Sequence, residues 1–334
     1  MNRIIRTTTL VAISIFGLNA ADVAAAEKIT IIVGGINKLI YLPPKLAENL
    51  GYFKDEGLNV ELQSQQAGVD AENELLAGAV QAVVGFYDHS IDLQAKGKEI
   101  ESIVIFGLVP GSMEMVRADA VDQIKNMGDI KGKTLGVTAL GSSSSFLGQY
   151  LAAKYGLKAS DYSMLPVGSG NSLIASIKQR RVEVAWTTEP TTSLLRANGD
   201  AKVLVDLSTV EGTRAALGGL YPASSLYVES SWAQTHKPEA EKLARAFVKT
   251  LHFIQTHTAE QIADRMPADY YGGNKALYVQ ALKASLPMYS PDGKMPDGGP
   301  ETVLRVMSAF NPHIKGKHIN LSRTYTNSFV NQTN

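Results

Sequence analysis

The feature that most constrains the fold is a repeated alternation of short apolar runs with segments of helical length. Lys28–Val33 is a β-branched run, and similar runs at 59–62, 82–85 and 103–106 are separated by helix-like segments such as 45–50 and 71–77. Strands that alternate with helices in this way form parallel sheets with helices on both faces. The sequence therefore predicts an α/β fold, with ligands bound at the carboxyl ends of the strands.

The alternation starts afresh in the middle of the chain, which predicts an inserted second domain. Beyond Met113–Arg117 new apolar runs follow at 134–137, 164–167, 182–186 and 202–205, and a strand at 224–228 returns to the first domain. Helices are expected at 238–257, 259–266, 275–286 and 301–310, followed by a polar tail from Ile319 that packs loosely. The predicted division is residues 27–112 and 222–334 for one lobe and 113–221 for the other.

The first 26 residues have the pattern of a secretory signal peptide. Arg3 and Arg6 precede an apolar stretch from Leu10 to Leu18, and the small residues of Val23–Ala26 suit cleavage before Glu27. The stretch is too short to span a bilayer. Because the chain has no cysteine for lipid attachment, we expect an unanchored protein of a Gram-negative periplasm.

Charge and composition exclude several functions. Lys and Arg total 32, as do Asp and Glu, and loss of residues 1–26 leaves a formal charge of −1, which argues against a nucleic-acid partner. The absence of cysteine excludes disulfides, thiolate metal sites and a cysteine nucleophile. The pairs His252/His257 and His313/His318 lie in no metal-binding motif, so we expect neither a metal nor a cofactor.

A strand, a small-residue loop and a helix follow one another from Thr134 to Tyr150. Gly141 allows a tight turn, and Ser142, Ser143, Ser144 and Ser145 place hydroxyls where the first N–H groups of a helix have no partners. Such a helix start favours an anion such as carboxylate, sulfonate or phosphate. The alternative is a helix cap that binds nothing.

An ordered set of motifs resembles a known family. Gly51–Val60 (GYFKDEGLNV) is closest to its pattern, and Ile130–Val137 (IKGKTLGV), Gly141–Ser145, Val182–Trp186 and Glu189-Pro190 follow in the expected order. The chain thus resembles the periplasmic substrate-binding proteins of ABC transporters for sulfonates, nitrate and taurine, with the related thiamine-precursor binders.

This resemblance implies a type II periplasmic-binding-protein fold. Two lobes, each a mostly parallel sheet flanked by helices, would be joined by two crossover segments near Gly111–Arg117 and Leu220–Pro222. A small ligand would close the cleft, and the closed monomer would dock on an ABC permease in the inner membrane. A ligand that touches both lobes shifts the open–closed equilibrium by its differential affinity for the closed state.

Under this resemblance the loops at the strand ends supply the ligand-binding residues. The expected set is Asn37, Tyr41, Gln66, Tyr87 and His89 from the first lobe, Ser142, Ser143, Ser144, Ser145, Asn171, Trp186, Thr187 and Glu189 from the second, and Tyr221 at a crossing. Lys38 and Arg214 are the main cationic candidates. Three alternatives stay open: Trp186 as core, His89 as a cap of the helix near Ser90, and Glu189 as a partner of its own helix.

The serines and aromatic residues favour a small organic anion, an aromatic carboxylate first and an alkyl sulfonate close behind. A neutral or amine-bearing heterocycle of the thiamine-precursor type is the alternative, because Glu189 would repel an anion. An exported enzyme is less favoured, since the cysteine-rich segment of the thiamine-precursor enzymes is absent and no nucleophile-elbow or phosphate-loop pattern occurs. An adhesion protein would show repeats, and none appears.

Overall fold

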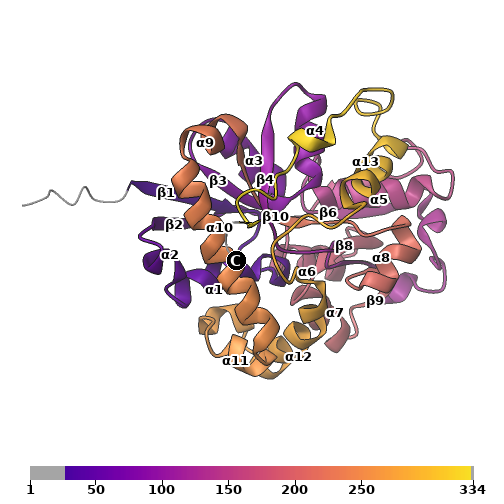
Figure 1. Ribbon diagram of the computed structural model, residues 1–334. Coiled ribbons are helices and arrows are strands. Elements are labelled where there is room, and N and C mark those ends of the chain that lie inside the picture. Colours follow the sequence, from indigo (N-terminus) through magenta and orange to yellow (C-terminus); the bar gives the residue numbers. More distant parts are fainter. Residues whose placement is uncertain (1–26, 332–334) are drawn as a thin grey trace, which may run out of the picture.

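The computed structural model describes residues 27–331, so the predicted signal peptide lies outside the described residues. Two five-stranded sheets form the two halves of the molecule (Figure 1). The first sheet has the order β2 (Asn59–Ser64), β1 (Lys28–Val33), β3 (Ala82–Phe86), β10 (Ser224–Glu229) and β4 (Ile100–Ile105). The second has the order β7 (Ser163–Pro166), β6 (Thr134–Val137), β8 (Val184–Thr188), β5 (Ser112–Arg117) and β9 (Ala201–Leu207).

Both sheets follow one plan, in which the strand that comes directly after a crossing pairs antiparallel with its neighbours. Strand β10 follows β9 along the chain but pairs antiparallel with β3 and β4. Strand β5 follows β4 but pairs antiparallel with β8 and β9. The chain therefore crosses between the halves twice, at residues 106–111 and 218–223. The expected α/β architecture of two lobes is confirmed, with each sheet mixed rather than wholly parallel.

The segment Gly111–Arg117 is only partly the crossing that we expected. Residues 112–117 form β5, in the interior of the second sheet, and the crossing ends at Gly111. The charged Glu114 interrupts the apolar run, which hides the strand from a reading of hydrophobic pattern. The division of the lobes at 112/113 and 221/222 stays a prediction.

Helices cover both sheets. The first lobe carries α1 (Leu42–Asn49), α2 (Tyr52–Asp55), α3 (Gly68–Leu76), α4 (Asp88–Ala95), α9 (Ser230–Thr235) and α10 (Lys237–Thr256). The second carries α5 (Ser143–Ala153), α6 (Asn171–Lys178), α7 (Thr191–Ala197) and α8 (Val210–Leu217). Three helices follow in the C-terminal part, α11 (Ala259–Ala263), α12 (Lys275–Ser285) and α13 (Gly299–Phe310).

In the longest helix, α10, the spacing of apolar residues in the sequence determines which side chains are buried. Leu243, Phe247 and Leu251 recur at a spacing of four and are fully buried, because they face α1, α2 and β4. Pro238 stands in its first turn, where a missing N–H costs nothing. Within residues 27–331 no helix combines the length and apolar character needed to cross a bilayer.

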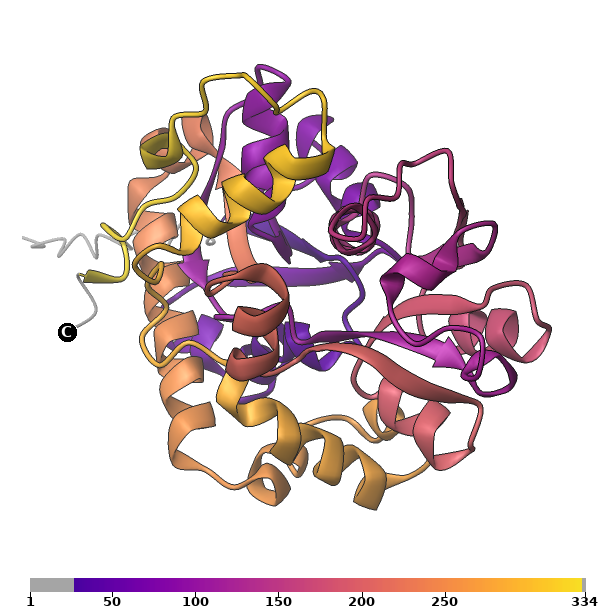
Figure 2. The same cartoon turned by 90° about the vertical axis from the view of Figure 1, so that its right-hand side faces the viewer.

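The C-terminal helices contact both lobes. Helix α12 packs on α7 of the second lobe and on a short 3-10 turn, Leu39–Tyr41, of the first. Helix α13 packs between α4 and α5. In Figure 2 the orange helices run along the first lobe and beneath both halves, and yellow α13 lies near the top. Any movement of one lobe against the other must therefore be accommodated by these two helices.

Within residues 319–331 the polar tail packs against the first lobe, contrary to expectation. Ser102 N donates to Thr324 O at 3.0 Å and Thr326 N donates to Ser102 O at 3.0 Å, which adds a short parallel bridge to β4. Phe329 and Val330 are buried. Hydropathy alone missed this because backbone pairing, not apolar side chains, holds most of the segment.

The contact between β3 and β10 gives a test of the core. A Cβ on Gly85 would lie 2.9 Å from the ring of buried Tyr227. Gly85→Ala should therefore destabilise the protein by about 1–3 kcal/mol, measured by urea unfolding. The double variant with Tyr227→Ala should lose less than the sum of the two single losses, because the clash is gone. Additive losses would contradict this packing.

Candidate functional site

A cavity of about 620 Å³ lies between the two lobes. Its first-lobe wall is formed by residues 35–38 and 64–66, and its second-lobe wall by residues 167–172, Ile174, Pro190, Thr191 and Leu194. Asp269, Tyr270 and Gly272, from the segment between α11 and α12, close a third side. The volume is in the range of small-molecule sites.

The position of the cavity follows from the topology. Its walls are the loops that leave β1, β2, β7 and β8 at their carboxyl ends. These strands are the parallel part of each sheet, and the two crossings turn the two carboxyl edges toward each other. This is where open α/β sheets bind ligands.

Lys38 is the only lysine or arginine among the residues that line the cavity. Its side chain is 8% exposed, and Nζ donates to the carbonyls of Gly34 at 2.6 Å and Gln66 at 3.4 Å. Burial lowers the pKa of Lys38 to about 7, and Asp70 opposes this shift through its charge. Within residues 27–331 no carboxylate forms an ion pair with Lys38. An ammonium with three N–H groups and two carbonyl acceptors can still donate one hydrogen bond.

The start of α6 supplies further donors to the same wall. Gly168 and Gly170 have φ of 68° and 61°, which other residues rarely adopt, and they turn the chain from β7 into α6 at Asn171. The first N–H groups of a helix lack intrahelical acceptors and carry partial positive charge. Asn171 and Ser172 therefore present backbone N–H donors beside the cavity, and Asn171 adds its side-chain amide. The Ser172 hydroxyl already donates to Ser169 O at 3.0 Å.

Three of the predicted ligand residues line this cavity: Asn37, Gln66 and Asn171. The others are each less than a tenth exposed and lie elsewhere: Tyr41, Tyr87, His89, Ser142, Ser143, Ser144, Ser145, Trp186, Thr187, Glu189 and Tyr221. Arg214 is exposed on α8. A ligand role for the buried set stays a prediction.

The predicted aromatic walls contact one another. Phe86 makes edge-to-face contacts with Tyr41 and Trp186, each with ring centroids 6.3 Å apart. Trp186 therefore bridges from the second lobe to the first. Tyr87 is wholly buried and its hydroxyl bonds Thr324 Oγ1 at 2.5 Å. Apolar packing between the lobes, rather than an open cleft, occupies this region.

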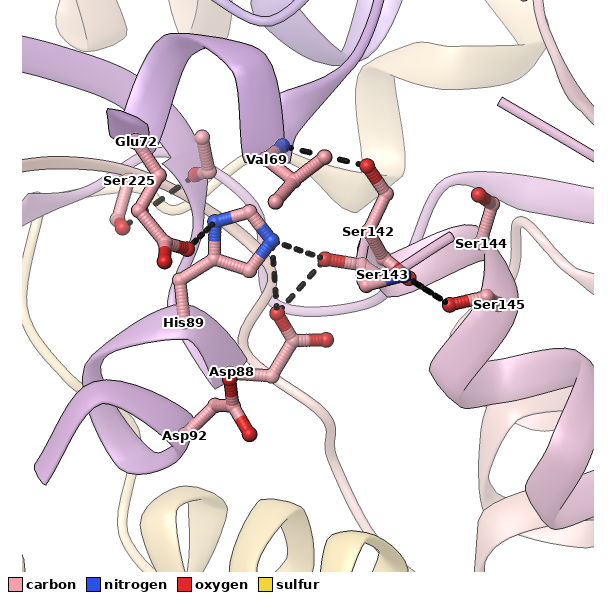
Figure 3. A network of polar contacts seen from close by, with 12 residues as sticks. Val69, Glu72, Asp88, His89, Asp92, Ser142, Ser143, Ser144, Ser145 and Ser225 are labelled. Atoms are coloured by element: carbon pink, nitrogen blue, oxygen red, sulfur yellow. Dashed lines mark hydrogen bonds and ion pairs between the residues drawn. The ribbon is translucent and has the colours of Figure 1, made fainter. Parts of the chain in front are cut away.

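All four serine hydroxyls form hydrogen bonds with protein groups rather than facing the cavity (Figure 3). Ser142 Oγ accepts from Val69 N at 3.2 Å, and Ser143 Oγ donates to Asp88 Oδ1 at 2.7 Å. Ser144 Oγ accepts from Thr138 N at 3.0 Å, and Ser145 Oγ accepts from Gly141 N at 3.1 Å. The helix start does face an anion-forming group, but that group is the protein's own Asp88.

A buried polar network surrounds Asp88 and His89 (Figure 3). His89 Nε2 lies 3.3 Å from Ser143 Oγ, and its Nδ1 lies 3.1 Å from Glu72 Oε2. Burial raises the pKa of Glu72 to about 8 and lowers that of His89 to about 4, so both groups favour their neutral forms. The Glu72–His89 contact is therefore a hydrogen bond between neutral groups. His89 does not cap its helix.

Ser143, His89 and Glu72 lie next to one another in space, as the members of a catalytic triad do. The geometry does not support Ser143 as a nucleophile. The Ser143 hydroxyl donates to Asp88 rather than to His89. All these side chains are buried, and none lines the cavity. A nucleophile must reach a reacting atom beside it, and Ser143 does not line the cavity between the lobes.

The remaining predicted residues have protein partners too. Tyr221, at the second crossing, donates to Asp88 Oδ2 at 2.8 Å. Glu189 Oε2 accepts from Ser193 N at 3.0 Å in the first turn of α7, which is the structural alternative for this residue. Thr187 is buried in β8.

Sequence reasoning missed part of the site. Ser64, Ser169, Ser172 and Asp269 line the cavity with polar groups, and Tyr270 supplies an aromatic side chain. The glycine-rich loop at 168–170 is a sequence signal that could have drawn attention to this wall of the second lobe. Nothing in the sequence places 269–272, which is far along the chain, against these loops. Within residues 27–331 no three His, Asp or Glu side chains cluster to hold a metal ion.

A family model described as "NMT1/THI5 like" matches residues 42–261, more than half of the chain. The chain belongs to the NMT1/THI5-like family. Its structure is also similar to that of a protein from Bordetella bronchiseptica RB50, with 33% sequence identity, coverage of 92% of this chain and 96% of that one, and a TM-score of 0.88.

More distant structures share the fold of this NMT1/THI5-like protein. The alkanesulfonate-binding protein SsuA from Xanthomonas axonopodis pv. citri, bound to MOPS, is 17% identical over 86% of this chain and 92% of its own, with a TM-score of 0.66. The periplasmic nitrate-binding protein NrtA from Synechocystis PCC 6803 is 11% identical over 92% and 88%, with a TM-score of 0.70. The fold is thus that of the periplasmic binding proteins, as the sequence resemblance implied.

One buried carboxyl of this NMT1/THI5-like protein has no partner. Glu114 is fully buried in β5, and neither of its oxygens has a hydrogen-bond partner within the described residues. Trp186 Nε1, on the paired residue of β8, is also without one. Burial raises the pKa of Glu114 to about 8. The carboxyl is therefore protonated at neutral pH.

This proton couples stability to pH. From about pH 4.5, where an unfolded glutamate ionises, to about pH 8, unfolding releases the Glu114 proton, so stability falls as pH rises. Glu114→Gln should flatten the pH dependence of the free energy of unfolding by up to about 1.4 kcal/mol per pH unit. Urea unfolding at pH 5 to 8 measures this, with exposed Glu211→Gln as the control. Equal slopes in wild type and Glu114→Gln would contradict a neutral Glu114.

Proposed function

We propose that this protein is a solute-binding protein that holds a small organic anion in the 620 Å³ cavity between its lobes. After export to the periplasm, the closed protein would deliver that anion to an ABC permease of the inner membrane. The observation that carries the proposal is the buried Lys38 ammonium, which lines the cavity without a carboxylate partner. A buried cation without a counter-ion is costly, and an anionic ligand would relieve that cost.

The other walls suit the rest of such a ligand. Asn37, Gln66 and Asn171 offer amide groups, and the first turn of α6 adds N–H donors with favourable dipole. Ile174, Leu194 and Tyr270 offer apolar and aromatic surface. This combination of one charged end and one apolar end supports an aromatic carboxylate, with an alkyl sulfonate as the second choice.

Lys38 should control both affinity and its pH dependence. An alkyl sulfonate such as butanesulfonate has no group that titrates between pH 6 and 9, so its affinity should fall as pH rises above about 7 and Lys38 loses its proton. Lys38→Met should weaken binding roughly 10- to 100-fold, as expected for a hydrogen bond to a charged group, and should flatten this part of the pH profile. Isothermal titration calorimetry from pH 6 to 9 measures both effects.

The matched control is Arg214→Met, which removes a cation from the exposed face of α8. It should leave affinity unchanged. Equal binding by wild type and Lys38→Met would overturn the anion site.

Tyr270 should discriminate between aromatic and alkyl ligands. Its ring lines the cavity from the third side and is mostly buried. Tyr270→Leu should weaken benzoate more than a small alkyl carboxylate such as butyrate, because only the aromatic ligand loses a ring contact worth about 0.5–1.5 kcal/mol. A thermal-shift titration compares the two ligands. Equal losses would favour a ligand whose ring does not meet Tyr270.

An amine-bearing heterocycle of the thiamine-precursor type remains the second candidate. The observation in its favour is Asp269, the only carboxylate in the cavity wall, which could bind an amine. Asp269→Asn should weaken such a ligand and leave a simple anion unaffected. Fold alone does not decide between binding and catalysis. Chemical change of a bound ligand during the calorimetric experiment would replace the proposal with an enzymatic one.

A further inference from the structure

The serines at the start of α5 divide into two pairs by where their hydroxyls reach. Ser142 and Ser143 bond groups of the first lobe, namely Val69 N on α3 and the Asp88 carboxyl on α4. Ser144 and Ser145 bond only Thr138, Gly141 and Ser142, all in the second lobe. Figure 3 shows the first pair toward Val69 and Asp88 and the second pair on the far side.

The first-lobe partner is held rigidly in place. Asp88 Oδ2 accepts from the Tyr221 hydroxyl at the second crossing, which leaves Oδ1 directed at Ser143. His89 also contacts Ser143, and Glu72 and Tyr227 lie 3.1 and 3.2 Å from its other ring nitrogen. A side chain at Gly68 would come within 2.8 Å of the His89 ring, so α3 can approach this closely only with glycine there. The acceptor is therefore preorganised for the hydroxyl of the opposite lobe.

These contacts lie away from the cavity. None of Val69, Asp88, Ser142 and Ser143 lines it. The Ser143–Asp88 hydrogen bond is buried and the Ser142–Val69 bond is partly buried. A hydrogen bond shielded from water is stronger than one at the surface. The interaction therefore acts on the arrangement of the lobes and not on the ligand.

We propose that Ser142 and Ser143, with Val69 and Asp88, form an interlobe latch that stabilises the closed arrangement of the two lobes. Separation of the two lobes must break both hydrogen bonds. The Asp88 carboxyl and the two serine hydroxyls must then form hydrogen bonds with water instead. The latch residues are positioning residues, because they act through the lobe equilibrium. A latch of this kind raises the closed fraction before any ligand is bound, and so raises apparent affinity.

The four serines provide their own matched test. Each serine is changed to alanine separately. The protein carries one fluorescent label on each lobe, attached at the exposed positions of Lys98→Cys and Lys158→Cys. The labels attach only there, because the chain has no other cysteine. Single-molecule energy transfer without ligand then reports the closed and open populations. Thermal unfolding confirms that each variant is folded.

The latch predicts that alanine variants of Ser142 and Ser143 change the open-to-closed ratio, whereas alanine variants of Ser144 and Ser145 do not. Burial raises the pKa of Asp88 to about 7, so the measurement is made at pH 8, where this carboxyl is mostly ionised. Ser143→Ala should then raise the open-to-closed ratio about tenfold or more and Ser142→Ala about threefold to tenfold, following the usual strengths of hydrogen bonds to charged and neutral groups. Ser144→Ala and Ser145→Ala should match the parent protein. The same shift in all four variants, or no shift in Ser142→Ala and Ser143→Ala, would overturn the latch. Since no ligand is used, this result is independent of whether the cavity binds an anion.

Discussion

The structure depends on the insertion of one whole sheet between two strands of the other. Strands β5 to β9 make up the second sheet, whereas the first sheet combines β1 to β4 with β10, which follows the insertion along the chain. The insertion requires two crossings, and the crossings set the carboxyl edges of the parallel strands face to face. The cavity at those edges follows from this arrangement, since loops from both sheets become its walls.

Two ionisable side chains, Lys38 and Glu114, are buried without an ion-pair partner among the described residues, and they have different roles. Lys38 and Glu114 are both buried, and in both cases desolvation shifts the pKa toward the neutral form. Glu114 lies inside the second lobe, where protonation removes the cost of its charge. Lys38 lies on a cavity wall, where an anion can be accommodated beside it. The same physical penalty therefore predicts a pH-dependent stability in one place and supports the proposed anion site in the other.

The start of α5 shows how a correct physical argument can reach an incomplete conclusion. Glycine, serines and a helix dipole do favour a negative charge, and the structure brings a carboxyl group to Ser143. That carboxyl belongs to Asp88, 55 residues earlier in the chain. Sequence spacing gives the chemistry of each loop, but it does not show which loop of the first lobe packs against it. The family resemblance supplied the arrangement of two lobes without supplying this contact.

The sequence by itself determined the alternation of strands and helices, the insertion of one set of βα units within another and the family, because these depend on local hydrophobic period and on ordered motifs. It also identified Asn37, Gln66, Asn171 and Lys38 as residues of strand-end loops. Only the tertiary structure decided that these four share a cavity, while the aromatic residues and serines pack between the lobes. It alone added Tyr270 and Asp269 to the cavity wall. The reason is that such contacts join segments up to about 230 residues apart, and their formation depends on how two lobes close rather than on any local pattern.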